Sequence, residues 1–337
     1  MKNNTFFYSY LPRFLIYFIS FILLTSCKFS TVDNSDIEDP GSTSFLLYGE
    51  APANSYLWNL TLYDTYAFAS DGENSFSVYD ILSPTNPTLL STFHLNTGSQ
   101  AIKQIKADWN YNLYIAAGNG GISVINCSNP ISPTSIYNDN TIYAGGLDIN
   151  EAYIAVINNS GWRIYYITTA YQLNEVCNFE YFISKIPRKV KFINNWLFVL
   201  TDESVDIFDV SNFSNPSLER SININRTVDF DIIENYLTVI TDTNLYFINI
   251  SSPLYAEIDI YYELEWFPIS IDFKNQYMFI SWSNRNVSAY RINSINSITE
   301  IARKEFSNPV YDMGFSDNYL YFANGLEGLK IYNFLDF

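Results

Sequence analysis

The amino-acid sequence predicts an all-β protein, a closed seven-bladed β-propeller with four antiparallel strands in each blade. A two-strand unit recurs seven times, further strand-like runs flank the units, and no sustained helical periodicity follows residue 27. The middle residues of the seven second strands lie 40 to 46 residues apart. Four strands in a period of about 42 residues correspond to one propeller blade.

Each repeated unit consists of two short runs of β-branched and aromatic residues, the composition that suits strands. Turns rich in Asn, Asp and Gly separate them, because these residues tolerate the positive φ of tight turns. The first strands are expected at 66–70, 113–118, 152–157, 197–202, 237–242, 278–282 and 320–325, and the second strands at 76–81, 122–127, 162–167, 205–210, 245–250, 287–292 and 329–334. An inner strand, such as 189–193, precedes each unit, and an outer strand, such as 217–222, follows most of them.

The ring is predicted to close by pairing the two ends of the propeller sequence. The last unit ends after its third strand, whereas residues 44–50 form an additional strand-like run before the first inner strand at 55–64. We therefore expect residues 44–50 to complete the seventh blade beside the C-terminal strand, which would cover an exposed sheet edge. The alternative is an open solenoid with two uncapped end units.

The first 27 residues have the pattern of a secretory signal. Lys2 and Arg13 provide positive charge, and residues 14–24 form an apolar run that is too short for the ~20 residues of a membrane-spanning helix. Residues 24–27 (Leu-Thr-Ser-Cys) resemble a bacterial lipobox. That resemblance implies that Cys27 receives a diacylglycerol and becomes the new N-terminus. The alternative is an ordinary signal peptide whose cysteine is incidental.

The chain is thus expected to have three parts: a lipoprotein signal peptide at 1–27, a flexible polar tether at 28–43, and a single propeller domain at 44–337. Lys28 follows the cysteine where some bacteria read an Asp as an inner-membrane retention signal. The expected location is extracytoplasmic, as an outer-membrane or cell-surface lipoprotein.

Charge and composition exclude several classes of function. The 337 residues include 35 Asp and Glu but 18 Lys and Arg, for a net charge of −17. This balance argues against a nucleic-acid partner, which needs basic side chains to displace counterions from phosphate. Anionic headgroups would also repel such a surface, so membrane attachment is expected to depend on the acyl chains. The 48% hydrophobic content excludes a disordered acidic chain.

Several second strands of the unit run into a turn that contains Ser and Pro: FSVYDILSPTNPTLL (76–90), ISVINCSNPISPTSI (122–136), VDIFDVSNFSNPSLE (205–219) and LYFINISSPLY (245–255). The chain resembles the LVIVD repeat family in these segments, well in the first, second and fourth blades, partly in the fifth, and poorly in the third and sixth. The resemblance implies a propeller in a bacterial cell envelope and brings no catalytic residue with it. The Gly-His and Trp-Asp signature of WD40 blades and the recurrent motif of quinone-binding propellers are missing.

The sequence offers few residues for chemistry. His94 is the only histidine and lies at an outer strand, remote from the ring axis. We therefore predict no catalytic residue, no metal site and no cofactor. Two acidic turns, at 71–74 and 202–203, lack the spacing of a calcium loop. Cys127 and Cys177 are expected to be separate buried thiols, and whether they pair is left open.

One group of residues is a candidate ligand site. The loops on one face of the sixth blade carry Trp266, Phe267, Trp282 and Arg285, a combination that suits binding of a glycan or a peptide. The alternative is that these aromatic residues pack between blades. The rare positive charges of Lys185, Arg188 and Lys189 form a weaker candidate, which could instead balance nearby carboxylates.

These observations favour a lipid-anchored, monomeric binding scaffold that recognises a protein or polysaccharide without transforming it. One alternative is a carbohydrate-active enzyme, a glycosidase or lyase that uses acidic residues of the propeller face. A further alternative is a periplasmic scaffold for outer-membrane assembly.

Overall fold

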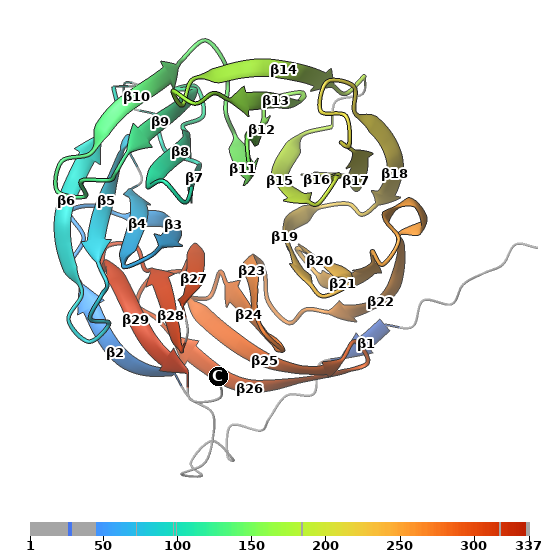
Figure 1. Cartoon of the computed structure of the whole chain (residues 1–337). Coiled ribbons are helices and arrows are strands. Elements are labelled where there is room, and N and C mark those ends of the chain that lie inside the picture. The colour runs from blue at the N-terminus through green and yellow to red at the C-terminus, as the bar shows by residue number, and fades with distance from the viewer. Residues whose placement is uncertain are drawn as a thin grey trace, which may run out of the picture.

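The computed structural model contains seven four-stranded antiparallel sheets arranged around a central axis (Figure 1). It describes the backbone of residues 26–28 together with residues 45–71, 73–96, 98, 100–182, 185–316 and 318–334. The expected signal peptide before Ser26 and the expected tether after Lys28 lie outside the described residues. The seven-bladed, all-β prediction is confirmed.

Each blade is a meander whose innermost strand lines the axis. Blade I comprises β3 (Leu57–Tyr63), β4 (Tyr66–Asp71), β5 (Ser75–Asp80) and β6 (Thr88–His94); blade II comprises β7 (Gln104–Ala107), β8 (Asn112–Ala116), β9 (Ile122–Asn126) and β10 (Thr134–Asp139); blade III comprises β11 (Gly146–Asn150), β12 (Tyr153–Ile157), β13 (Gly161–Ile167) and β14 (Leu173–Glu180). Blade IV comprises β15 (Pro187–Ile193), β16 (Trp196–Thr201), β17 (Ser204–Asp209) and β18 (Ser217–Asn223).

The remaining blades follow the same order, with one short 3-10 turn, η1 (Pro253–Tyr255), in blade V. Blade V comprises β19 (Thr227–Ile233), β20 (Tyr236–Thr241), β21 (Asn244–Asn249) and β22 (Glu257–Glu263); blade VI comprises β23 (Pro268–Lys274), β24 (Tyr277–Trp282), β25 (Asn286–Ser294) and β26 (Ser297–Glu305); blade VII comprises β27 (Asp312–Ser316), β28 (Tyr319–Ala323), β29 (Leu329–Phe334) and, from the other end of the chain, β2 (Phe45–Ala51).

The hydrophobic core lies between the faces of neighbouring blades. Successive side chains of a strand point to opposite faces of the sheet. In β16, Leu197 and Val199 therefore pack toward blade III, whereas Phe198 and Leu200 pack toward blade V. Both faces of a middle strand are thus covered, which explains why these strands are continuous apolar runs in the sequence.

The ring closes as the sequence predicts. β2 pairs antiparallel with β29, from Phe45 opposite Phe334 to Ala51 opposite Leu329, and the two strands lie side by side at the rim (Figure 1). Gly49 of β2 lies against the turn of blade I, where a Cβ atom would stand 2.0 Å from the carbonyl oxygen of Pro84. This close approach admits only glycine.

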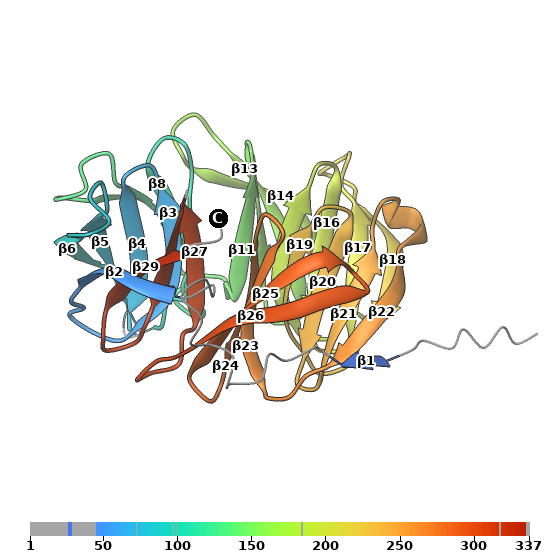
Figure 2. The ribbon, with the colours of Figure 1, turned by 90° about the horizontal axis from the view of Figure 1, so that it is seen from below.

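A short additional strand, β1 (Ser26–Lys28), lies parallel to β22 at the outer edge of blade V, with Cys27 opposite Tyr262 (Figure 2). This pairing makes blade V a five-stranded sheet. Within the described part of the chain, no helix is long and apolar enough to cross a membrane.

Candidate functional site

Two sets of loops form one face of the disc. The turns between the second and third strands of each blade, and the connections that enter the inner strands, lie at the same end of the blades because consecutive strands are antiparallel. We call this end the loop face. Residues 264–267, which precede β23, and residues 283–285, which follow β24, belong to it. Trp266, Phe267 and Arg285 therefore lie in loops of this face, whereas Trp282 is the last residue of β24.

Trp282 is part of the protein interior rather than of the exposed loop face. It is 1% exposed, and its Nε1–H donates a hydrogen bond to Ser288 Oγ at 3.0 Å. The ring of Trp266 meets it edge-on, with 5.8 Å between centroids, and packs against the same core. The Arg303 guanidinium lies 4.2 Å from the Trp266 ring centroid, an arrangement typical of a cation–π contact. These contacts support the packing interpretation for Trp282.

The other two candidates, Phe267 and Arg285, are accessible to solvent. Phe267 is 51% exposed. Arg285 carries a half-exposed side chain whose Nη2 lies 3.1 Å from Glu305 Oε1. The structure thus brings Trp266 and Trp282 together, directs the Arg285 guanidinium to Glu305, and leaves Phe267 at the surface.

A second aromatic group on the loop face was not predicted. Tyr56 and Trp58, at the start of blade I, meet Tyr311, at the start of blade VII. The centroids of Trp58 and Tyr311 are 4.2 Å apart, and Trp58 remains 38% exposed. We call these three residues the I/VII aromatic cluster. Burial and a hydrogen bond with Tyr311 raise the pKa of Tyr56 to about 12, so its hydroxyl stays protonated at neutral pH.

The backbone of blade VII makes room for this cluster. Gly325 has a φ of +55° in the turn between β28 and β29, and a Cβ atom there would lie 2.8 Å from the Tyr56 ring. The next residue, Leu326, is 69% exposed. The cluster therefore has an aromatic surface and an aliphatic neighbour, the kind of patch that binds a sugar ring or an apolar side chain.

The central channel is lined with charges from the inner strands. It has a volume of about 130 Å³, and its lining includes the charged residues Lys106, Asp148, Lys189, Lys191, Asp231, Asp272 and Asp312. Lys189 Nζ lies 2.6 Å from Asp229 Oδ1, and Lys191 forms an ion pair with Asp231. Both pairs join blade IV to blade V.

Polar side chains of the inner strands also join other neighbouring blades by accepting hydrogen bonds from backbone N–H groups. Each accepts a hydrogen bond from an N–H of the next inner strand: Asp312 Oδ2 from Leu60 (2.8 Å), Gln104 Oε1 from Leu147 (2.8 Å), Asp148 Oδ2 from Phe192 (2.8 Å) and Asp229 Oδ2 from Ile271 (3.2 Å). Inner strands of different blades share no sheet, so these side chains satisfy N–H groups that would otherwise lack a partner. This arrangement gives the channel carboxylates a structural role.

Lys185 also has a carboxylate partner, because its Nζ lies 3.2 Å from the buried Asp206. Together with the pairing of Lys189 and Asp229, this contact supports the interpretation that the basic residues entering blade IV balance nearby acids. Arg188 is exposed.

Burial raises the pKa of several channel carboxyl groups. The pKa of Asp312 rises to about 6, because burial outweighs the hydrogen bond from Leu60 and the charges of Lys106 and Lys189. Burial and the charges of Asp231 and Asp312 raise the pKa of Asp272 well above its usual range. Both groups hold a proton more tightly in the folded state than in the unfolded chain, where an Asp pKa is about 3.9.

This difference predicts that stability falls as the pH rises. A carboxyl group whose pKa is raised by folding contributes fully below about pH 4, and its contribution is lost as the pH rises through its folded-state pKa, which is about 6 for Asp312. Asp272→Asn removes the buried charge and should unfold at a higher urea concentration than the wild type at about pH 7.5, but at the same concentration near pH 4. Glu219→Gln, at an exposed position of β18, should match the wild type at both pH values. If Asp272→Asn were the less stable protein at about pH 7.5, the carboxylate would be stabilising.

The remaining residues with reactive side chains, a histidine and two cysteines, lie away from the loop face or are at least partly buried. His94 ends the outer strand β6 and is exposed. Cys127 and Cys177 are both free thiols, the first buried as predicted and the second half-buried. Burial raises the pKa of Cys127 to about 12, which keeps it unreactive at neutral pH. In the described ranges, no group of three or more His, Cys, Asp or Glu side chains is placed to hold a metal ion.

Comparison with known proteins agrees with this architecture. A profile of the LVIVD repeat matches residues 56–94, 103–141 and 188–224, which correspond to blades I, II and IV. The protein is thus a seven-bladed β-propeller in which three blades match the LVIVD repeat. No curated protein sequence matches the chain.

Several solved structures share the fold. Sqt1 of Saccharomyces cerevisiae is 8% identical, with a TM-score of 0.63, over 87% of this chain and 98% of that one. Raptor of Chaetomium thermophilum is 12% identical, with a TM-score of 0.70, over 87% of this chain and 29% of that one. A protein from Lactobacillus plantarum is 12% identical, with a TM-score of 0.64, over 75% and 88% of the two chains. At these identities the likeness shows the fold alone.

Proposed function

We propose that the protein is a binding scaffold that uses its loop face to hold a protein or polysaccharide ligand without transforming it. The observation that carries this proposal is the I/VII aromatic cluster, in which Trp58 is supported by Tyr311 at 4.2 Å and remains 38% exposed. A ring held in place from one side offers its other side to a ligand at little cost in conformational entropy. Phe267, half-exposed on the same face, extends the apolar surface.

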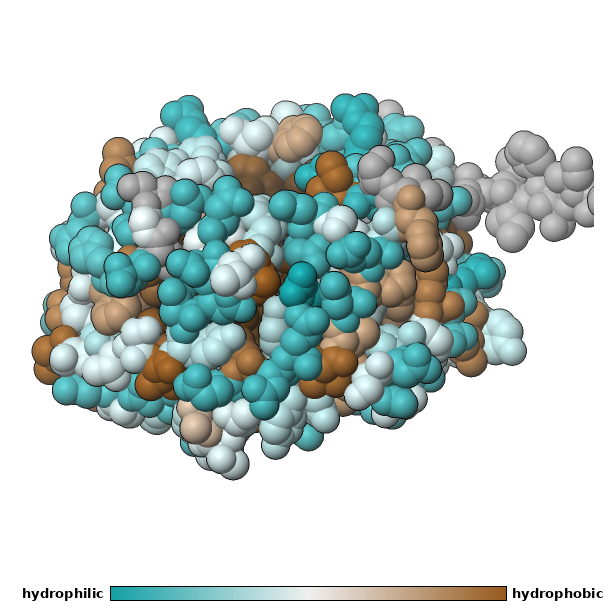
Figure 3. All heavy atoms as spheres, turned by 90° about the horizontal axis from the view of Figure 1, so that it is seen from above, coloured by the Kyte–Doolittle hydropathy of each residue, from teal (hydrophilic) through white to brown (hydrophobic). Residues whose placement is uncertain are grey.

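The chemistry of the cluster suits a ligand with both apolar and polar groups. The rings provide stacking surfaces for the apolar face of a sugar or for a side chain. The phenol groups of Tyr56 and Tyr311 provide hydrogen-bond donors and acceptors. Apolar side chains elsewhere are scattered among polar ones on the rim seen in Figure 3, in keeping with a monomer that contacts its ligand through one face.

Substitution of Trp58 tests the proposed ligand face. In a screen of immobilised cell-envelope polysaccharides and envelope proteins, the wild type should bind at least one saturably, and Trp58→Ala should weaken that binding at least tenfold. Trp109→Ala is the matched control, because Trp109 is 73% exposed on the turn between β7 and β8, on the opposite face. Equal binding by the wild type and Trp58→Ala would contradict the assignment of the site.

The proposal also includes a lipid anchor at Cys27 and a position at the outer membrane or cell surface. It is supported by the leader pattern of residues 1–27. Cys27→Ala should abolish incorporation of radiolabelled palmitate and release the protein from membranes. Protease treatment of intact cells should digest a surface-exposed propeller but spare a periplasmic one. Stable crosslinking to outer-membrane machinery would favour an assembly scaffold.

A carbohydrate-active enzyme is the second candidate, and the raised pKa values of Asp272 and Asp312 favour it, because a general acid needs a proton near neutral pH. The channel volume argues against it. About 130 Å³ holds about four water molecules at ~30 Å³ each, whereas ligand pockets begin near 300 Å³. Release of reducing ends or unsaturated products from a polysaccharide panel would favour the enzyme.

A further inference from the structure

An aromatic contact closes the junction between blades III and IV on the face opposite the loop face. The first residue of the second strand of a blade faces the next blade, and in blade III this residue is Tyr153. The ring of Phe213 stacks on Tyr153, with 3.8 Å between centroids and 16° between planes. Phe213 belongs to the seven-residue turn between β17 and β18 of blade IV. The turn of one blade thus fills an aromatic position beside its neighbour.

The junction between blades V and VI lacks the long turn that makes this contact. Tyr236 is the first residue of β20 and packs toward blade VI, as Tyr153 packs toward blade IV. In blade VI, however, β25 and β26 form a tight hairpin in which Ser294 pairs with Ser297. Only two residues join the strands. One of them, Ile295, packs against the same core as Tyr236, so the hairpin has an aliphatic residue here but no aromatic counterpart of Phe213.

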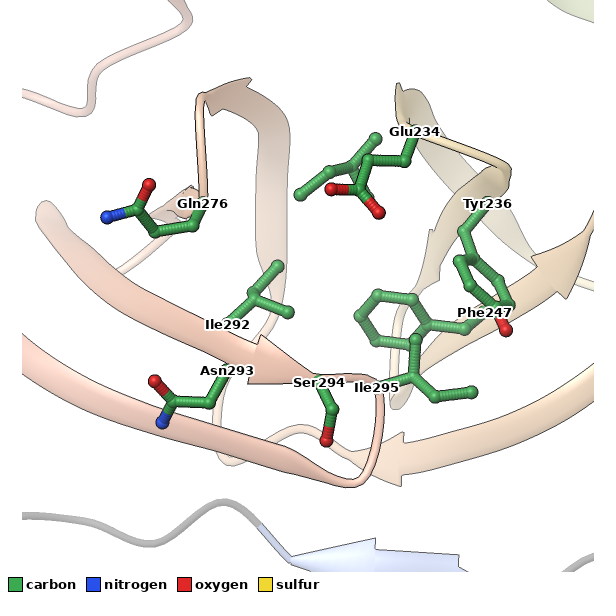
Figure 4. Close-up of a pocket in the computed structure, with 9 residues that line it drawn as sticks. Glu234, Tyr236, Phe247, Gln276, Ile292, Asn293, Ser294 and Ile295 are labelled. Atoms are coloured by element: carbon green, nitrogen blue, oxygen red, sulfur yellow. The ribbon is translucent and has the colours of Figure 1, made fainter.

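A pocket of about 350 Å³ opens at this place. Its apolar lining includes Tyr236 and Phe247 of blade V and Ile292 and Ile295 of blade VI. Figure 4 shows Tyr236, Phe247 and Ile295 gathered on one side of the pocket, with Ile292 across from them. The volume is at the lower end of the range for ligand pockets, about 300 to 1,000 Å³. It therefore suits a single side chain better than a large cofactor.

The rim of the pocket is polar and negatively charged. Glu234 is exposed on the turn between β19 and β20, and Gln276 is exposed on the turn between β23 and β24. Asp259 is also close, because its Oδ2 accepts a hydrogen bond from the Tyr236 hydroxyl at 3.1 Å. An occupant with positive charge beside its apolar group would complement this rim.

We propose that the pocket between blades V and VI binds an aromatic side chain of a partner polypeptide, flanked by basic residues. The partner's aromatic ring takes the position beside Tyr236 that Phe213 takes beside Tyr153, and the basic residues face Glu234. This site goes beyond the proposed function, because it lies on the opposite face of the disc from Trp58. Loss of ligand binding at one face should therefore leave binding at the other unchanged.

A defined peptide tests the proposal. The probe is acetyl-Gly-Lys-Phe-Lys-Gly-amide, titrated calorimetrically into the full chain. Saturable binding with one site is expected, with no binding when Ala replaces Phe and weaker binding when Glu replaces both Lys residues. Ser294→Trp places a large ring at the pocket and should weaken binding at least tenfold. Ser214→Trp, on the long turn of blade IV, is the matched control and should bind like the wild type.

A second measurement needs no variant. The methyl resonances of Ile292 and Ile295 should shift on titration of the wild-type protein with the probe, which locates the peptide even if Ser294→Trp folds poorly. Absence of saturable binding would overturn the proposal, as would equal binding of the Ala peptide. Equally tight binding of N-acetylphenylalanine amide alone would also overturn it, since the pocket would then be a site for free aromatic molecules.

Discussion

Replacing Trp282 with Ala should lower the free energy of unfolding by about 3 to 5 kcal/mol, the usual cost of removing a large aromatic side chain from a core. Trp282 is 1% exposed and packs among Met278, Ile280 and Tyr290 in the core between blades V and VI. The substitution also removes the hydrogen bond from its indole to Ser288. Equilibrium unfolding in urea, followed by circular dichroism, measures the change.

Phe267→Ala is the matched control for this prediction. Phe267 lies on the same face of the same blade but is 51% exposed, so its removal should change the free energy of unfolding by less than about 0.5 kcal/mol. If Trp282→Ala instead left stability unchanged, the indole would have to be an accessible part of the loop face.

The predictability of the fold from sequence has a simple physical origin. Every blade repeats the same alternation of apolar runs and turns, so seven weak strand signals reinforce one another at a common spacing. The partner of the C-terminal strand was also predictable, because a seventh blade with three strands leaves an edge that residues 44–50 can cover. Strand ends were placed less well: the inner strand of blade I was expected at 55–64 but spans Leu57–Tyr63.

The candidate site was harder to predict. Trp58 and Tyr311 are far apart in the sequence and meet only because the ring closes between blades VII and I. The channel contacts likewise join residues of consecutive blades. One signal was available for Trp282: Met278, Ile280 and Trp282 alternate along β24, and this period of two places all three on the same covered face.

The sequence also contains a pattern that marks the residues lining the central channel. The inner strands alternate polar, apolar and polar residues at the same position of most repeats, as in Lys189-Val190-Lys191 and Asp229-Phe230-Asp231. The opposite charges of neighbouring blades predict pairing between adjacent inner strands, and the structure contains both ion pairs. Which carboxylates would accept a backbone N–H could not be predicted, because that depends on how adjacent inner strands are offset.

Phe45 is the second position where we expect a substitution to lower stability strongly, because its side chain packs where the ring closes. Phe45 is 7% exposed, and its ring contacts Phe334 of the paired strand at 5.5 Å and Phe279 of blade VI at 6.3 Å between centroids. Phe45→Ala should therefore lower the free energy of unfolding by about 3 to 5 kcal/mol. It should also accelerate amide hydrogen exchange along β2 and β29, because the side chain that holds β2 against the core is lost.

Leu47→Ala is the control that distinguishes the effect of lost side-chain packing from the effect of lost strand pairing. Leu47 lies on the same strand, opposite Tyr332, but its side chain is 53% exposed. This variant should keep both the wild-type urea midpoint and the slow exchange of β29 amides, because the backbone hydrogen bonds of the closure are unchanged. If Phe45→Ala behaved like Leu47→Ala, pairing of the two chain ends alone would hold the ring closed. A large loss for Phe45→Ala alone would mean that closure depends on the aromatic core between blades VI and VII.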